Sequence, residues 1–307
     1  MNSFVEEKMK KTRSVVTRRD FIRGTVGATL GATLLGPEWL KGAGGAAGFA
    51  PAQARSSVFI VRDRAVLNEA MAADKTVLKK MLGQVLAGVT GESDMKSAWL
   101  KLVSPTDVIG LVPTSVMNPT HPELIALVTD SLVEAGVPAA NIRKAQGWSV
   151  DVKSLTALIN LPGLKAHWLT GIGTVLKNYI LYSGAARNYH DQNSSKLAEI
   201  WNLPQVKGKT RLNLVDALQP VCDKGPQVDP RYRWVYGGLI AGTDPVAVEA
   251  VGLKIIQTKR DALRGEPWPI SPPPICVEAA DKVYKLGNSE LKNIDVRTIG
   301  WAEDSLV

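Results

Sequence analysis

Cysteine and histidine are both scarce in this chain of 307 residues. Cys222 and Cys276 are its two cysteines, and His121, His167 and His190 are its three histidines. The count alone excludes an iron–sulfur cluster with four cysteine ligands from this chain, and no CxxC motif is present. In an oxidising compartment the two cysteines could form one disulfide, but the sequence does not show whether they lie near each other.

Polybasic runs, internal repeats and long linkers are also missing. Residues 1–54 hold eight Lys/Arg and four Asp/Glu, so half of the formal net charge of +8 belongs to this segment and the rest carries close to +4. A chain of this charge pattern has no basic patch typical of nucleic-acid or lipid binding. The remaining residues suffice for one sizeable core, and we expect a single domain over residues 55–307.

The first 54 residues have the pattern of a targeting segment. The twin-arginine motif "TRRDFIR" at 17–23 precedes an uncharged Gly/Ala-rich run at 24–36 and a small-residue site, "AQA", at 52–54. This pattern predicts a Tat export signal that is cleaved before Arg55, recognition by the Tat machinery, and a periplasmic or otherwise exported protein. The alternative is a membrane anchor, but the run is shorter and richer in glycine than the roughly 20 apolar residues of a span. We therefore expect no permanent membrane span.

Short β-rich runs alternate with helical patterns along the rest of the chain. The patterns predict strands at 58–61, 108–112, 142–145, 155–161, 211–215, 238–241 and 294–299. They predict helices at 75–87, 121–135, 170–181, 195–201, 245–256 and 276–286. This alternation is typical of an α/β layered fold with a largely parallel sheet and helices on both faces.

Two helix starts carry capping signals. "NPTHPEL" predicts Thr120 as an N-cap with Glu123 three residues later, which is a capping box. "GTDPVAV" predicts Asp244 as an N-cap with Pro245 as the first helical residue. The role of Asp244 could end there, since capping is the commoner use of such an aspartate.

Four polar clusters directly follow predicted strands. They are "PTSVMNPTH", which ends at His121, "PGLKAH", which contains Lys165 and His167, Asp216, and "GTDP", which contains Asp244. If all four strands are parallel, these clusters meet at the carboxyl edge of one sheet, where open α/β folds bind ligands. An antiparallel strand would remove its member from the set.

The apolar stretch "LTGIGTVLKNYILYS" holds Lys177 and Asn178 at its centre. If 170–181 is helical, Lys177 must either extend to water or meet an anion, because an unpaired buried ammonium is costly. In the second case Lys177 supplies charge for a carboxylate or phosphate and Asn178 adds a directional donor and acceptor.

The histidines allow two interpretations as well. His167 and His190 could transfer protons or, together with Asp216, ligate a metal, although no spacing matches a standard metal motif such as HExxH. They could equally be hydrogen-bonded structural residues. "GIGTVLKN" also lacks the third glycine of GxGxxG and the Ser/Thr of a P-loop.

The order and spacing of several motifs resemble the domain of unknown function 362 family. The motifs are "THPELIALVTDSLVEAGV", "INLPGLKAHWLTGIGTVLKNYI", the later His190, "LVDAL" followed by "DKGPQ", and "GGLIAGTDPVAVEAVG". The resemblance spans roughly residues 108–300 and implies a compact α/β domain. Its signature positions correspond here to Lys165, His167, Lys177, Asn178, His190, Asp216 and Asp244.

The chain departs from the family pattern in three places. Where members often read Ile-Lys-Pro-Asn, this chain has "GLVPT" at 110–114, without the lysine and the asparagine. Glu249 stands where an aspartate is common, and the ferredoxin-like cysteine module of many members is missing. The first departure weakens the expectation of a complete anion site, and the last excludes electron transfer through a cluster of the chain's own.

Three functional hypotheses follow. The first is an exported protein that binds a small anion, or a metal or cofactor complex, through the signature residues and His121, with Lys177, His167 and His190 as catalytic groups if it is an enzyme. The second is an accessory of a periplasmic redox system that contacts a redox protein through exposed tryptophans such as Trp148, Trp168, Trp201, Trp234 and Trp268. The third is a degenerate binding module that kept the fold and lost the chemistry.

Overall fold

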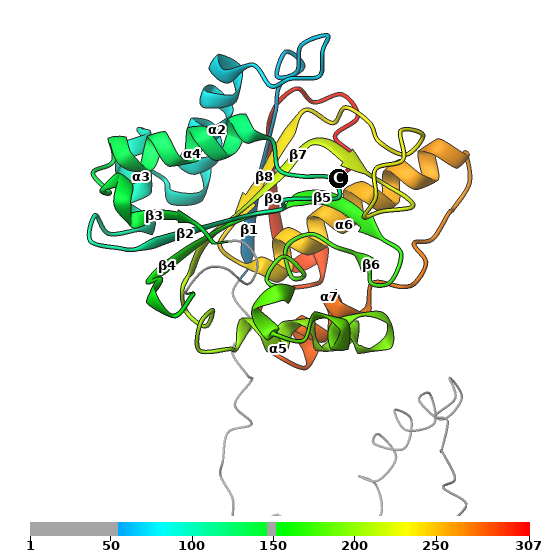
Figure 1. Ribbon diagram of the computed structural model, residues 1–307. Helices are drawn as coiled ribbons and strands as arrows, with labels where there is room; N and C mark the ends of the chain where they lie inside the picture. Colours follow the sequence, from blue (N-terminus) through cyan, green and yellow to red (C-terminus); the bar gives the residue numbers. More distant parts are fainter. Residues whose placement is uncertain (1–54, 146–151) are drawn as a thin grey trace, which may run out of the picture. The chain divides into compact units, whose positions relative to one another are not determined.

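A nine-stranded mixed sheet forms the centre of the protein. The computed structural model describes residues 55–145 and 152–307 (Figure 1). The strand order is β3-β2-β4-β7-β8-β1-β9, and β5 pairs with both β7 and β6 beside this path. The strands are β1 (Ser56–Arg62), β2 (Ile109–Pro113), β3 (Ile142–Lys144), β4 (Ala157–Leu161), β5 (Gly163–His167), β6 (Gly171–Ile172), β7 (Thr210–Val221), β8 (Gly238–Gly242) and β9 (Ile294–Gly300).

Most strand pairs are parallel. β3, β2, β4 and the first half of β7 run in one direction, β5 continues this direction beside the second half of β7, and β9 is parallel to β1. β8 is antiparallel to both of its neighbours, β7 and β1. The predicted α/β class with a largely parallel sheet is confirmed.

Helices cover both faces of this sheet (Figure 1). On one face lie α2 (Lys75–Thr90), α3 (Met95–Leu102) and α4 (Pro122–Glu134), and on the other α5 (Leu197–Trp201), α6 (Pro245–Arg264) and α7 (Ile275–Lys282). β1 shows why two layers are needed: Phe59 and Val61 pack into the core with α2, while Val58 and Ile60 pack into the core with α6. Such a strand, apolar on both faces, is typical of a sheet buried on both sides.

Short 3₁₀ segments connect several elements. They span Ala139–Asn141, Val152–Ser154, Ile180–Ser183, Ala186–Tyr189, Asp191–Lys196 and Leu291–Asn293. All seven predicted strands are present, and five of the six predicted helices have a counterpart, with 195–201 beginning as a 3₁₀ segment. The sequence patterns missed α3, β5 and β6.

The predicted helix at 170–181 is wrong. This stretch begins with β6, which pairs with β5, and continues through turns into the 3₁₀ segment Ile180–Ser183. Gly171 has a φ of 77°, and a Cβ atom there would lie 2.6 Å from the carbonyl oxygen of Pro272. The backbone N–H of Val175 is donated to the Glu249 carboxylate at 2.5 Å instead of to a helical carbonyl. Tertiary contacts therefore override the apolar periodicity.

One of the two predicted caps is confirmed. Asp244 accepts hydrogen bonds from the N–H groups of Val246 and Ala247 at the start of α6. The capping box at Thr120 is wrong, because α4 has His121 at its N-cap without a side-chain cap bond. The Thr120 hydroxyl is donated to the carbonyl of Leu161 instead, which ties the loop after β2 to the end of β4.

The predicted export signal, residues 1–54, lies outside the described residues, as does Trp148. All described residues fall within one compact unit, Gln53–Val307. Within the two described segments, no helix combines the length and the apolar character that a membrane crossing requires.

Candidate functional site

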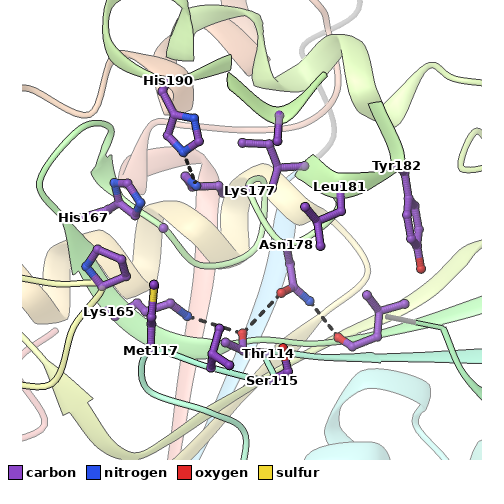
Figure 2. Close-up of a pocket in the computed structure, with 16 residues that line it drawn as sticks. Thr114, Ser115, Met117, Lys165, His167, Lys177, Asn178, Leu181, Tyr182 and His190 are labelled. Carbon is purple, nitrogen blue, oxygen red and sulfur yellow. Dashed lines mark hydrogen bonds between the residues drawn. The ribbon is translucent and has the colours of Figure 1, made fainter. Parts of the chain in front are cut away.

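A cavity of about 310 Å³ lies at the carboxyl end of β2 and beside β5. Figure 2 shows the side chains that line it. Its walls come from the loop after β2, from β5, and from the turns and 3₁₀ segments that follow β6. Among the described residues that line it, none is Asp or Glu. Its polar lining consists of Thr114, Ser115, Lys165, His167, Lys177, Asn178, Tyr182 and His190.

Lys165 and His167 enter the cavity from the same face of β5. "PGLKAH", expected as a loop after a strand, is itself largely this strand, and side chains two positions apart on a strand point to the same side. Both residues are buried, with exposed fractions of 5% and 6%. Lys165 Nζ donates to the carbonyl of Gly163 at 3.0 Å and to the Thr114 hydroxyl at 3.3 Å.

Burial changes the protonation of both groups. It lowers the pKa of Lys165 to about 7, and the charge of Lys177 acts in the same direction. Burial likewise lowers the pKa of His167 to about 3, with further contributions from Lys177 and His190. His167 Nδ1 accepts the N–H of Leu169 at 3.1 Å, so the neutral ring carries its hydrogen on Nε2.

Lys177 and His190 form a direct pair (Figure 2). Lys177 Nζ and His190 Nε2 are 2.9 Å apart, and the rings of His190 and His167 stack with centroids 5.6 Å apart. Burial lowers the pKa of Lys177 to about 8, and burial together with the charge of Lys177 lowers the pKa of His190. The pair is best described as an ammonium that donates to a neutral imidazole.

Glu249 holds the turn that carries Lys177 and Asn178. This residue of α6 is fully buried, and its Oε2 accepts the N–H of Val175. Burial raises the pKa of Glu249 to about 7, against the lowering effect of the N–H groups of Val175 and its neighbours. In the sequence, Glu249 stands out only as a departure from the family pattern, which gives no sign of this role.

A chain of asparagine amides fixes Asn178. Asn178 Nδ2 donates to the carbonyl of Val112 and to Asn160 Oδ1, both at 2.7 Å, and its Oδ1 accepts the Thr114 hydroxyl at 3.3 Å. Asn160 in turn donates to Asn213 Oδ1 at 3.0 Å across the β4–β7 pair. Asn178 thus acts as a structural support of the cavity. Asn160 within the apolar run "LINL" and Asn213 within "LNLV" are the sequence signals that could have revealed this chain of amides.

The mouth of the cavity is apolar and strained. Val116 and Met117, in the loop after β2, are 62% and 47% exposed. Met117 and Asn118 have φ values of 59° and 67°, a left-handed conformation that is costly for non-glycine residues and often occurs at functional sites. Asn118 anchors this loop by donating to the carbonyl of Leu164 at 3.2 Å.

Asp216 and His121 lie together but do not line this cavity. Asp216 Oδ2 accepts the backbone N–H of His121 and is 2.7 Å from His121 Nδ1. Burial by itself lowers the pKa of His121, and the hydrogen bond and charge of Asp216 outweigh it, so the pKa is raised. His121 borders a separate hollow together with Gln219 and Arg233.

Asp244 lies at the opposite edge of the sheet. Because β8 is antiparallel to β7 and β1, its last residues lie beside the first residues of those strands. Asp244 Oδ2 accepts the hydroxyl of Ser56, the first residue of β1, and the N–H of Asn288. The expectation that Asp244 converges with Lys177 and the histidines is therefore wrong, and the structure shows Asp244 as a cap.

No group of three potential metal ligands is formed by the described His, Cys, Asp and Glu residues. The candidate set of His167, His190 and Asp216 is divided, because Asp216 is paired with His121. Cys222 and Cys276 are both buried and free.

The tryptophans within residues 55–145 and 152–307 do not gather at the surface. Trp201 is buried, Trp234 and Trp268 are half-buried, and Trp168 is 58% exposed.

The comparisons with known proteins bear on the segment that carries most of this site. Residues 121–254 match the family model "Domain of unknown function (DUF362)". The match supports the domain family that the motifs resemble, and it includes every lysine, histidine and asparagine of the cavity described above. The DUF362 match begins after the loop with Thr114 and Met117, so that this wall lies outside it. No curated protein and no solved structure matches the chain.

The chemistry available in this cavity is that of a buried amine, a half-buried amine and a neutral imidazole donor. Lys177 supplies positive charge, His167 Nε2–H supplies a hydrogen bond, and Lys165 lies near its point of half-protonation at neutral pH. Such a set recognises an acceptor group with negative charge.

Proposed function

We propose that this protein binds a small organic anion, with a carboxylate or phosphate group, in the cavity at the carboxyl edge of the sheet. The observation that carries the proposal is that Lys165 and Lys177 line one cavity whose described lining contains no acidic residue. Burial and the charge of Lys177 disfavour the charged form of Lys165, and the opposite effects of Glu249 and Asp216 are smaller. Neither carboxylate lines the cavity, so the lining itself holds no counter-charge. An anionic ligand supplies the missing counter-charge.

The remaining lining restricts the size and polarity of the ligand. A volume of about 310 Å³ lies near the lower end of the usual range for ligand pockets, roughly 300–1,000 Å³. The exposed Val116 and Met117 at the mouth, together with Ile180 and Leu181, favour a ligand with an apolar part. We infer an anionic head on the lysines and a short apolar tail toward the mouth.

His167 contributes a fixed hydrogen bond to this proposal. With a pKa of about 3, the ring stays neutral at pH 7 and donates through Nε2. His190 accepts from Lys177 and so directs the lysine ammonium. Lys177, His167 and His190, considered as catalytic groups from the sequence, therefore have binding and orienting roles in this proposal.

The test is calorimetric titration of wild type and Lys177→Met with sulfate, phosphate, pyruvate and benzoate. A hydrogen bond to a charged group is worth about 1.5–3 kcal/mol, so we expect affinity for the bound anions to fall roughly 10- to 100-fold. Methionine retains much of the aliphatic stem and limits the loss of packing.

The matched control is Lys207→Met, since Lys207 is exposed and does not line the cavity. It should bind as the wild type does. If folded Lys177→Met binds with unchanged affinity, or if none of the four anions binds the wild type, the proposal is wrong and a degenerate module becomes the better description.

We also propose export through the Tat pathway, which rests on the "TRRDFIR" motif and the "AQA" site of the first 54 residues. Replacing Arg18 and Arg19 by lysine should retain the full-length chain in the cytoplasm, as measured by cell fractionation and the mass of the purified protein. Processing of the doubly substituted chain at wild-type level would contradict Tat export.

A further inference from the structure

The amine of Lys165 is held in a geometry that suits a nucleophile. A neutral lysine amine has two N–H donors and one lone pair. Lys165 Nζ donates one hydrogen bond to the carbonyl of Gly163 and one to the hydroxyl oxygen of Thr114. In the neutral amine these two bonds use both hydrogens and leave the lone pair free on a side chain that lines the cavity.

The surroundings favour the neutral form at Lys165 and the charged form at Lys177. Lys165 is almost fully buried, whereas Lys177 is half-buried and donates to His190. Burial and a neighbouring ammonium are the two conditions that activate a lysine for attack on a carbonyl group. The pKa of about 7 at Lys165, below the value of about 8 at Lys177, is consistent with this division.

We propose that Lys165 forms an imine with a 2-oxo carboxylate whose carboxylate group is held by Lys177. This inference rests on the proposed function, because it requires the anion to enter the cavity. A 2-oxo carboxylate places a carbonyl carbon next to the anionic group, and thus offers one group to each lysine. The second function of the site is then covalent capture of a carbonyl compound.

The step balances without an oxidant or reductant. The lone pair of Lys165 Nζ forms the N–C bond with the carbonyl carbon, and the carbonyl oxygen leaves as water with the two amine hydrogens. A C=N bond replaces the C=O bond. His167, which carries its hydrogen on Nε2 and has no hydrogen bond there in the described part of the chain, lies in the same cavity to donate to the carbonyl oxygen.

The experiment traps the imine on the unmodified full-length chain. The protein is incubated with pyruvate and cyanoborohydride, and the intact mass and the modified residue are determined by mass spectrometry. We expect one reduced pyruvate per chain, located at Lys165 by fragmentation of the peptide that contains both Lys165 and Lys177. Because the residue is mapped in the wild type, the result does not depend on the folding of a Lys165 variant.

Four comparisons sharpen the test. Lactate has the carboxylate without the carbonyl and should give no adduct, and acetone has the carbonyl without the carboxylate and should label Lys165 weakly. Lys177→Met should need at least tenfold more pyruvate for half-maximal labelling. Lys207→Met should label as the wild type does.

The outcomes separate this inference from the binding proposal. Pyruvate that binds in calorimetry but leaves no adduct, or an adduct at Lys177 or at exposed lysines, overturns the imine and leaves anion binding intact. If neither pyruvate nor any other anion binds, both proposals are overturned.

Discussion

Asn160 and Asn213 show how single polar residues shape this site from inside the sheet. Both are fully buried on strands that are otherwise apolar, and each satisfies its amide by donating to the next partner across the strands. Buried amides are tolerated when they are paired, and paired networks fix one arrangement of their members. Asn178, at the end of this chain of amides, uses both of its N–H groups on Val112 and Asn160. It is therefore a positioning residue, and the lysines and His167 remain to contact a ligand.

The pair of His121 and Asp216 predicts a pH-dependent contribution to stability. The pKa of His121 is raised in the folded protein, so its protonated form is favoured by folding. The stabilisation is fully present below the unfolded pKa of about 6.5 and is lost as the pH rises through the folded pKa. We expect His121→Gln to cost about 1–2 kcal/mol near pH 5.5 and clearly less near pH 9.

The measurement is urea unfolding of wild type and His121→Gln at both pH values. Other groups titrate in both proteins, so their effects cancel in the difference as long as they lie far from His121. A cost that is equal at the two pH values, or that grows with pH, would contradict a protonated His121 in the folded protein.

Among the secondary-structure elements, the contact of α6 with the turn after β6 decides the position of the cavity lysines. Removing the Glu249 carboxylate leaves the N–H of Val175 and its neighbours without an acceptor, at a cost of about 1–3 kcal/mol. We expect Glu249→Ala to destabilise the protein by on the order of 2 kcal/mol and to weaken anion binding, because Lys177 and Asn178 follow directly in this turn. Glu249→Gln keeps one acceptor oxygen and should restore most of both properties.

Stability is measured by urea unfolding, and binding by titration with sulfate at a temperature where both variants are folded. Glu278→Ala is the control, since Glu278 is exposed at the start of α7 and does not line the cavity. The role assigned to Glu249 fails if the alanine variant is destabilised but binds sulfate with unchanged affinity.

The same turn shows where prediction from sequence succeeded and where it stopped. Seven of the nine strands were predictable because they contain short β-rich runs between turn residues, whereas β5 and β6 were missed. Asp244-Pro245 marked the start of α6 because that cap is local. The stretch at 170–181 has helical periodicity, but its backbone is held by Glu249 and by the close approach of Pro272 to Gly171, both distant in sequence. Local periodicity carries no information about such partners.

For the site, the residue types were predictable and their grouping was predictable in part. Lys165, His167, Lys177, Asn178 and His190 do share one cavity. The grouping with Asp244 failed because strand direction is not encoded in the strand's own residues, and β8 is antiparallel. The grouping with Asp216 failed because Asp216 lies within the long strand β7 and faces His121 at the start of α4.

At the scale of the whole molecule, two lysine amines are concentrated in one cavity, although the chain as a whole has a modest net charge. The cavity has Lys165 and Lys177 without a lining acid, while Asp216, Glu249 and Asp244 are each engaged with backbone N–H groups elsewhere. These carboxylates therefore serve the fold, and the two amines of the cavity are left for a ligand.

This division predicts that anion binding is coupled to proton uptake. In the free protein the pKa of Lys165 is about 7 and that of Lys177 about 8, so both are partly deprotonated at pH 8. A bound anion stabilises the charged form of each amine and raises its pKa. Sulfate, which stays fully ionised here, should therefore bind with proton uptake at pH 8, and its affinity should fall as the pH rises from about 7 to 9. Titrations at pH 8 in two buffers of different ionisation enthalpy measure the number of protons taken up on binding, and Lys165→Met should take up fewer.

Sulfate binding could instead occur without proton uptake and with the same affinity at pH 7 and pH 9. That result would show that the two lysines remain fully charged in the free cavity and that neither is available as a neutral amine.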